Sequence, residues 1–150
     1  MDARRATLED AHDIARLLHD FNTEYGEPSP GPQALAERIE QLLGADTAVL
    51  LAGEPPHGLA VLRFRPSIWT QGLECYLAEL YVVPDRRGRG TGRALMEAVL
   101  ALARSEGADY IDLNTSEDDV AARALYESVG FDNREGKPDG PVTYYYEREL

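Results

Sequence analysis

Two helical patterns separated by a proline-rich break occupy the first third of the chain. Thr7 and Asp10 have the spacing of a helix N-terminal capping pair, and we expect a short strand before them. Residues 26–32 predict a loop, because their three prolines remove backbone donors and fix φ. Gly44 is placed to end the second helix. The apolar residues on the two helix faces are Ile14, Leu17, Leu18 and Phe21, then Leu35, Ile39, Leu42 and Leu43.

The middle of the chain changes from helical to strand-like patterning. Residues 47–52, 59–64 and 74–83 are rich in Val, Leu and Tyr, and they predict an antiparallel meander. A Pro-Pro-His-Gly turn separates the first two of these runs. A loop rich in glycine and arginine, residues 86–93, then leads into an amphipathic helix that we expect to stop near Gly107.

The C-terminal part predicts a strand at 110–113, a helix, and two further strands. One of these strands should follow Gly130 and Phe131, and the last should cover 142–147. The helix is indicated by apolar residues at i, i+4 and i+8: Ala121, Leu125 and Val129. Alternation along the last strand would place three tyrosines on its two faces: Tyr144, Tyr145 and Tyr146.

This order of elements predicts one α/β (α+β) domain over residues 1–150, in which helices cover a mixed sheet. A chain of 150 residues with 43% apolar residues is large enough to bury a core. Its 15 Lys and Arg against 27 Asp and Glu give a net charge of −12, which argues against binding nucleic acid or an anionic membrane.

The single cysteine and the short apolar runs indicate which cellular compartment and which cofactors to expect. Cys75 is the only cysteine, so neither an intramolecular disulfide nor a cysteine-based metal site can form, and we expect no metal. The charged N-terminus lacks the apolar region of a signal peptide, and no apolar run approaches the roughly 20 residues that cross a bilayer. We therefore expect a cytoplasmic protein without a membrane partner.

The glycine- and arginine-rich loop has the features of an anion site. Glycines allow close backbone approach, and the following helix N-terminus adds partial positive charge. Four arginines add +4 in eight residues, so the rest of the chain carries −12 − 4 = −16. These arginines are Arg86, Arg87, Arg89 and Arg93.

Two phosphate-binding alternatives fit this loop less well. A P-loop needs Gly-Lys followed by Ser or Thr, but Lys137, the only lysine, lies elsewhere. A dinucleotide-binding Gly-x-Gly-x-x-Gly pattern is begun by Gly88 and Gly90, yet its third position is Arg93. Asp112 does stand about 20 residues downstream, where an acidic ribose ligand is expected.

The pattern Arg-x-x-Gly-x-Gly, formed by Arg87, Gly90 and Gly92, resembles a motif of the GNAT superfamily of acyl-CoA-dependent N-acetyltransferases. A second motif supports the likeness: Asp119-x-x-Ala-x-x-x-Tyr126-x-x-x-Gly-Phe is similar to the family's Asn-x-x-Ala-x-x-x-Tyr-x-x-x-Gly-Phe. Both motifs together, in this order, are much more specific than either alone. The strong part of the resemblance covers residues 74–131.

The resemblance implies a mixed, mostly antiparallel sheet of about seven strands with helices on both faces. Its fourth and fifth strands would splay apart and hold acetyl-CoA between them, the fourth being residues 74–83. The pantetheine arm would pair with the backbone of Leu80, Tyr81 and Val82. Asp119 would be a further cofactor contact. The pyrophosphate would lie on the loop and the helix start, which comprise Arg87, Gly88, Arg89, Gly90, Thr91, Gly92 and Arg93.

The resemblance also implies a mechanism without a covalent enzyme intermediate. Tyr126 matches the family's general acid for the departing thiolate. Glu79 stands one residue before the cofactor-binding backbone, and we expect it to orient the substrate ammonium and take its proton, directly or through water. Trp69 would contribute to the acceptor site. Asp119 departs from the family's Asn, because a carboxylate accepts hydrogen bonds but cannot donate as an amide does.

The expected activity is acetyl transfer from acetyl-CoA to a primary amine, and the acidic chain favours a small cationic acceptor. Two alternatives stay open: acetylation of a protein or peptide amine, and a non-catalytic module that binds acyl-CoA. Family members often associate through sheet edges or C-terminal strands, so the resemblance also implies a homodimer.

Overall fold

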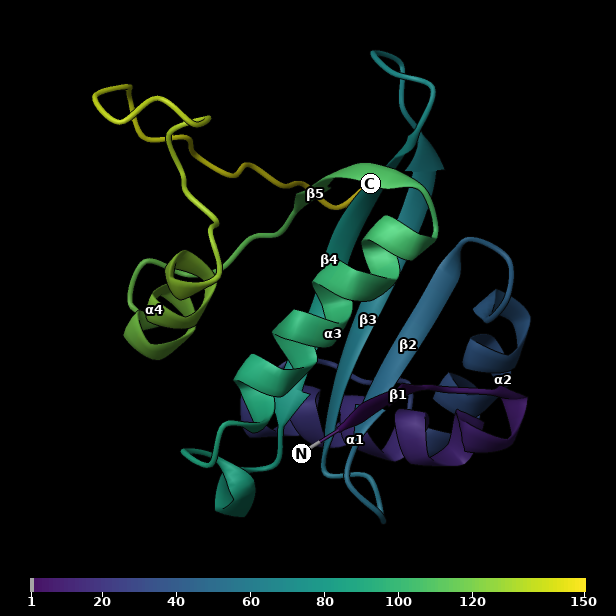
Figure 1. The fold of residues 1–150 in the computed structure, drawn as a ribbon. Helices are drawn as coiled ribbons and strands as arrows, with labels where there is room; N and C mark the ends of the chain where they lie inside the picture. Colours follow the sequence, from purple (N-terminus) through teal and green to yellow (C-terminus); the bar gives the residue numbers. More distant parts are fainter. Residues whose placement is uncertain (1) are drawn as a thin grey trace. The chain divides into compact units, whose positions relative to one another are not determined.

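A computed structural model describes residues 2–150 (Figure 1) and divides the chain into two compact units at Leu113 and Asn114. The first unit contains a five-stranded sheet with the helices α1, α2 and α3, and the second contains α4. The prediction of one domain over the whole chain stays a prediction.

The sheet of the first unit has the order β1-β2-β3-β4-β5. Neighbouring strands from β1 to β4 pair antiparallel, and β5 pairs parallel to β4. This confirms the predicted mixed, mostly antiparallel class. The strands are β1 (Ala3–Arg5), β2 (Thr47–Ala52), β3 (Gly58–Pro66), β4 (Leu73–Val82) and β5 (Ala108–Asp112).

Helices cover both faces of this sheet, as predicted. The core on one face joins α1 (Ala11–Glu24) and α2 (Pro32–Leu42) to alternate residues of the strands, such as Val49 and Leu51. Because neighbouring side chains in a strand point to opposite faces, the intervening residues of β2 face the other way, where α3 (Thr91–Ser105) packs (Figure 1). The fully buried side chains of α3 include three large apolar ones, Leu95, Met96 and Val99.

The predicted capping pair fixes the chain before α1. The Thr7 N–H donates to Asp10 Oδ2 over 2.8 Å, at the start of a short 3-10 turn, Leu8–Asp10. Arg4 binds the same carboxylate through both guanidinium nitrogens, at 2.8 and 2.9 Å. The hydrogen bonds from Arg4, which have the largest effect, and from Thr7 lower the pKa of Asp10 to about 2.

The second unit corrects two predictions. Its helix, α4 (Val120–Ser128), is present, but the strands expected after Phe131 and over 142–147 are not strands. The described residues therefore form five strands rather than about seven. In place of the expected strand pairing, the Thr143 N–H donates a hydrogen bond to the Asn133 carbonyl. The side chains of Tyr144, Tyr145 and Tyr146 are 60–86% exposed. Tyrosine favours strands only where a partner strand supplies packing and hydrogen bonds.

Candidate functional site

The two strands β4 and β5 separate halfway along β4. Their pairing runs from Leu73 to Tyr76, which lies opposite Asp112, whereas β4 continues to Val82 in pairing with β3. Among the described residues no strand pairs with the other edge of β4 over Leu77–Val82. This is the splay that the resemblance implied, and it leaves backbone groups of the predicted cofactor strand available to an extended ligand.

A β-bulge interrupts β4 immediately before Glu79. The register passes from Val61↔Glu79 to Leu62↔Leu77, so Ala78 has no partner on β3. In a regular strand two consecutive side chains point to opposite faces, yet Ala78 and Glu79 line the same cavity. The bulge therefore directs Glu79 toward the α1 and α2 face of the sheet.

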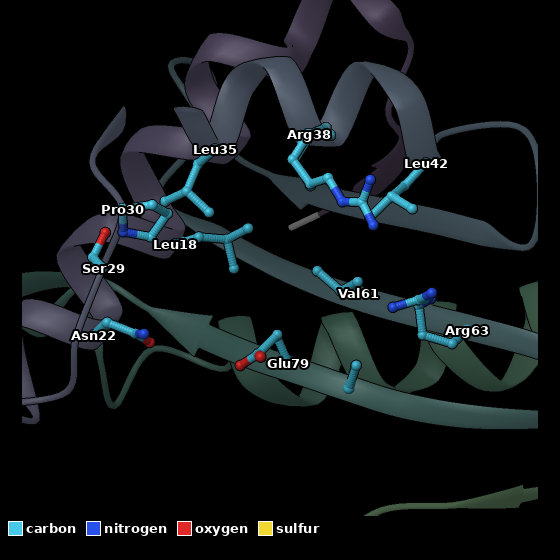
Figure 2. A pocket seen from close by; sticks show the side chains of 12 residues that line it. Leu18, Asn22, Ser29, Pro30, Leu35, Arg38, Leu42, Val61, Arg63 and Glu79 are labelled. Atoms are coloured by element: carbon cyan, nitrogen blue, oxygen red, sulfur yellow. The ribbon is translucent and has the colours of Figure 1, made fainter. Parts of the chain in front are cut away.

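That cavity has a volume of about 220 Å³ and lies between α1, α2, β3 and β4 (Figure 2). Glu79 is half-buried in its wall, and burial raises the pKa of this carboxyl above its ordinary value. A carboxylate with a raised pKa accepts a proton more readily, as a general base must. The lining residues are Leu18, Asn22, Ser29, Pro30, Leu35, Arg38, Ile39, Leu42, Val61, Arg63, Ala78 and Glu79.

The glycine-rich loop has the backbone geometry that anion binding requires. After a 3-10 turn at Pro84–Arg86, Gly88 and Gly90 adopt φ values of 75° and 84°, which favour glycine. Gly90 is the N-cap of α3, so the first-turn N–H groups, those of Thr91, Gly92 and Arg93, lie at the positive end of the helix. No carboxylate of residues 2–150 lies within 4 Å of the Arg86 or Arg89 guanidinium, whereas Arg93 pairs with Glu97.

Arg87 has an internal partner that the sequence did not reveal. Its guanidinium forms a two-pronged ion pair with Glu24 at the end of α1, with N–O distances of 2.9 and 3.0 Å. Its Nε donates to the Val82 carbonyl over 2.8 Å, so this carbonyl of the predicted cofactor strand is already bonded. Arg87 thus ties the loop to α1, and its direct contact with a phosphate stays a prediction.

Tyr81 completes this connection from the β4 side. Its hydroxyl donates to Glu24 over 3.1 Å, and its ring stacks on Phe21 with centroids 4.8 Å apart. The Arg87 guanidinium lies 5.6 Å from the Tyr81 ring centroid, within cation–π range. Hydrogen bonding to Arg87 lowers the pKa of Glu24. Only the backbone of Tyr81 therefore remains for a ligand, since its side chain belongs to the core.

Tyr126 lies in the second unit on α4, half-buried. Burial, together with the Asp119 carboxylate, raises the pKa of Tyr126 to about 12. The phenol therefore stays protonated across the neutral range and can donate a proton. The Tyr126 and Phe131 rings meet edge to face with centroids 6.1 Å apart.

Both ends of α4 are fixed by motif residues. Asp119 is the N-cap, and its Oδ1 accepts from the Ala122 N–H over 3.2 Å. At the other end Gly130, with φ of 98°, and Phe131 donate to the carbonyls of Glu127 and Tyr126, which is a Schellman cap. The second motif thus defines the helix ends, while a contact of Asp119 with a cofactor stays a prediction.

Two other predicted features lie away from this cavity. Trp69 is 87% exposed in the loop between β3 and β4 and lines neither of the two described cavities, so its acceptor role stays a prediction. Cys75 lines the second cavity, of about 260 Å³, which shares Arg63 with the first. Burial raises the pKa of the Cys75 thiol to about 12.

Residues 2–150 contain no cluster of three or more His, Cys, Asp or Glu side chains arranged for a metal ion. The expected absence of a metal stays a prediction. Over the same residues, no helix is both long enough and apolar enough to span a bilayer.

Comparisons with known proteins consistently find acetyltransferases. The model of the acetyltransferase (GNAT) family matches residues 12–131. A crystal structure of a candidate acetyltransferase from Arthrobacter sp. FB24 is 50% identical, with a TM-score of 0.92 over 100% of this chain and 96% of that one.

Two curated relatives cover most of the chain. Aminoglycoside N(6')-acetyltransferase type 1 of Stenotrophomonas maltophilia is 33% identical over 88% of this chain and 86% of its own length. The uncharacterized N-acetyltransferase YhfO of Bacillus subtilis (strain 168) is 28% identical over 91% and 93%, respectively.

Proposed function

The chain belongs to the GNAT acetyltransferase family, and we propose that it transfers the acetyl group of acetyl-CoA to a primary amine by direct attack within a ternary complex. The observation that carries this proposal is the position of Glu79. This half-buried carboxylate lies in the wall of a cavity and belongs to the part of β4 whose second edge pairs with no strand of residues 2–150.

Proteins of this family use acetyl-CoA, which supplies an activated acetyl thioester. The residues present fit such a ligand. The left-handed Gly88 and Gly90 and the N-terminus of α3 suit a pyrophosphate, with Arg86 and Arg89 nearby in sequence. The open edge of β4 suits an extended arm that bonds to the backbone of Leu80–Val82.

Glu79 would prepare the amine. An alkylammonium has a pKa near 10.4, about 3.4 units above pH 7, and its deprotonation costs about 4.6 kcal/mol at that pH. Glu79 can hold the ammonium and accept its proton, directly or through water, and the raised pKa of its carboxyl favours that transfer.

Tyr126 would protonate the departing sulfur. Its pKa of about 12 keeps the hydroxyl proton in place until a stronger base, such as a developing thiolate, is near. The ammonium proton passes to Glu79, and the neutral amine then forms a C–N bond to the thioester carbonyl carbon. As the C–S bond breaks, the Tyr126 proton passes to sulfur, and the second proton of the attacking nitrogen leaves to solvent to give the neutral amide. Solvent reprotonates Tyr126 and takes the proton from Glu79, so one proton is released for each acetyl group transferred.

The state of Cys75 supports direct attack over a covalent acetyl-enzyme. This only cysteine is 0% exposed, and burial raises the pKa of its thiol to about 12. A thiol that remains protonated is a poor nucleophile.

The net charge of −12 attracts cationic amines at long range, and the similarity to an aminoglycoside acetyltransferase agrees with a small amine as acceptor. Acetylation of peptide amines and a non-catalytic acyl-CoA module are the alternatives. The directed and half-buried Glu79 favours catalysis over the module. A cytoplasmic location and a homodimer stay predictions.

Thiol release from acetyl-CoA tests the proposal. We expect release that depends on an added amine, drawn from diamines, polyamines, aminoglycosides, amino acids and basic peptides. Tyr126→Phe should lower kcat by about 10²-fold, the scale of a general acid, with little change in the KM for acetyl-CoA.

The matched control is Tyr144→Phe, which removes a hydroxyl from a 79% exposed tyrosine and should leave kcat unchanged. Binding of acetyl-CoA without release for any amine would contradict the proposal in favour of the binding module. Equal kcat values for Tyr126→Phe and Tyr144→Phe would contradict the proposed role of Tyr126 as the general acid.

A further inference from the structure

The acceptor cavity carries opposite charges toward its two ends. Figure 2 shows the Arg38 and Arg63 side chains toward one end, and Glu79 and Asn22 toward the other. The arginines come from different elements, α2 and β3, so the fold brings them together. Figure 2 shows Val61 between Glu79 and Arg63, and the further aliphatic residues that line the cavity are Leu18, Leu35 and Leu42.

The two guanidinium groups differ in their carboxylate partners. Among residues 2–150 no carboxylate oxygen lies within 4 Å of Arg38, whose Nη1 donates to the neutral Gln41 side chain over 2.9 Å. Arg63 forms a long ion pair with the exposed Asp46, with an N–O distance of 3.8 Å that is beyond hydrogen-bond distance, so its N–H donors are not used by that carboxylate. The cationic end of the cavity therefore offers donors to an external anion.

Glu79 does not neutralise these arginines. Its carboxylate lies beyond 4 Å from both guanidinium groups, although all three side chains line one cavity. At the Glu79 end, Asn22 Nδ2 donates to the Pro28 carbonyl over 2.7 Å, which leaves the amide oxygen as an acceptor for an ammonium. The cavity thus has one end suited to an ammonium and one suited to an anion.

We propose that the acceptor is an amino acid with an apolar side chain, whose carboxylate binds Arg38 and Arg63 while its amine meets Glu79. This inference rests on the proposed acetyl transfer and names its substrate class. A guanidinium binds a carboxylate through paired hydrogen bonds, which gives orientation as well as affinity. The aliphatic lining accommodates the apolar side chain.

The cavity disfavours the polycations that the net charge alone suggests. A diamine would place its second ammonium near two guanidinium groups, and like charges repel most strongly at contact distance. The field of the acidic surface is screened beyond about 8–10 Å in physiological salt.

A matched acceptor series tests the proposal in the thiol-release assay. L-leucine, L-leucinamide and 3-methylbutylamine share one apolar body, and only leucine carries the carboxylate. We expect kcat/KM for leucine to exceed that for 3-methylbutylamine by about 10- to 100-fold, the scale of a charge-assisted hydrogen bond. When kcat/KM is expressed per neutral amine, leucinamide should behave like 3-methylbutylamine, because the pKa of an α-amino group is about 7.7–8.0 and that of an alkylammonium about 10.4.

Arg38→Met and Arg63→Met should each reduce this preference by about tenfold or more, measured as the ratio of kcat/KM for leucine to kcat/KM for 3-methylbutylamine in the same variant. Arg65→Met is the control, because Arg65 lines only the second cavity and pairs with Glu74 over 2.6 Å. Each variant is first shown to melt and to bind acetyl-CoA as the wild type does.

Three outcomes would overturn the inference: equal use of leucine and 3-methylbutylamine, a preference that survives in both cavity variants, or a loss as large in Arg65→Met. Release with diamines or aminoglycosides but not with amino acids would leave acetyl transfer intact and reject this acceptor class. Absence of release with every amine would instead reject the proposed function itself.

Discussion

The two side chains to which we assign proton transfer are held in place by different interactions. Glu79 lies on β4, which pairs with β3 along its length and carries Tyr81 into the core of α1 and α2. Tyr126 lies on α4, a nine-residue helix with no fully buried residue, whose ends are fixed by Asp119 and Gly130. Long-range packing therefore positions Glu79, whereas local caps maintain the helix of Tyr126.

The same physical cause acts on both groups with opposite chemical results. Burial raises the pKa of each. For Glu79 the shift makes the carboxylate a better proton acceptor, while for Tyr126 it keeps the phenol a proton donor. The environment of each group thus agrees with the proposed base on the strand and the proposed acid on the helix.

Replacing Glu79 should give the largest effect in this comparison. Glu79→Gln should lower kcat/KM at pH 7 by about 10²-fold, the scale of a general base. The wild-type profile should lose activity as pH falls through a pKa above the ordinary carboxyl value of about 4.3, because protonated Glu79 cannot accept a proton. This limb should disappear in the variant, measured as kcat/KM against pH.

Glu74→Gln is the control for this profile, because Glu74 lies on the same strand but pairs with Arg65. It should keep the wild-type limb. An unchanged rate and pH profile in Glu79→Gln would remove the proposed base and, with it, the contrast between strand and helix.

Substitutions at two helix-ending glycines can distinguish helix stabilisation by packing on the sheet from stabilisation by local caps. Gly107 follows α3 and Gly130 follows α4, with φ of 93° and 98° and open space where a Cβ would lie. Alanine in this left-handed conformation costs about 1–2 kcal/mol at either site. Because α3 packs on the sheet, Gly107→Ala should lower Tm, by about 2–4 °C per kcal/mol in a chain of this size.

Gly130→Ala should instead lower kcat several-fold and leave the main thermal transition nearly unchanged. Thermal melting and initial rates on the two variants measure the difference. If Gly130→Ala lowers Tm as much as Gly107→Ala does, α4 unfolds cooperatively with the sheet, and the comparison of global with local support fails.

The smallest effect is expected at Asp119. Asp119→Asn keeps a capping side chain of similar strength but removes a charge that raises the pKa of Tyr126, so that pKa should fall below about 12. Absorbance titration of tyrosinate, with Tyr126→Phe subtracted in the same background, measures the shift. Asp119→Ala, which removes the cap, should cost α4 about 1 kcal/mol. Equal pKa values in Asp119→Asn and wild type would show that this charge does not act on the phenol.

Most of the first unit could be predicted from periodicity. The run at 47–52 is a strand with the predicted bounds, and the Thr7–Asp10 pair caps the chain before α1. The glycine loop was also predictable, because its motif requires specific φ values. Such features depend on short-range patterns, which a sequence displays directly.

The remaining features depend on contacts that the sequence does not encode locally. The bulge at Ala78 is hidden in a run that reads as an ordinary strand. Arg87 and Glu24 are 63 residues apart, and no motif links them. Arg38 belongs to no sequence motif, and only the packing of α2 brings its side chain to the same cavity as Arg63 of β3. The predicted strand at 142–147 failed because strand propensity needs a partner strand to be realised.

The unpaired edge of β4 has a consequence for solubility in the cell. An exposed edge strand is a template for any extended polypeptide, and so for aggregation. A ligand that pairs with Leu77–Val82 would block that edge, and at 100 times its Kd it would stabilise the fold by about 2.7 kcal/mol. Expression yield and storage life would therefore depend on the supply of acyl-CoA, so the small molecule needed for the reaction would also protect the protein from aggregation.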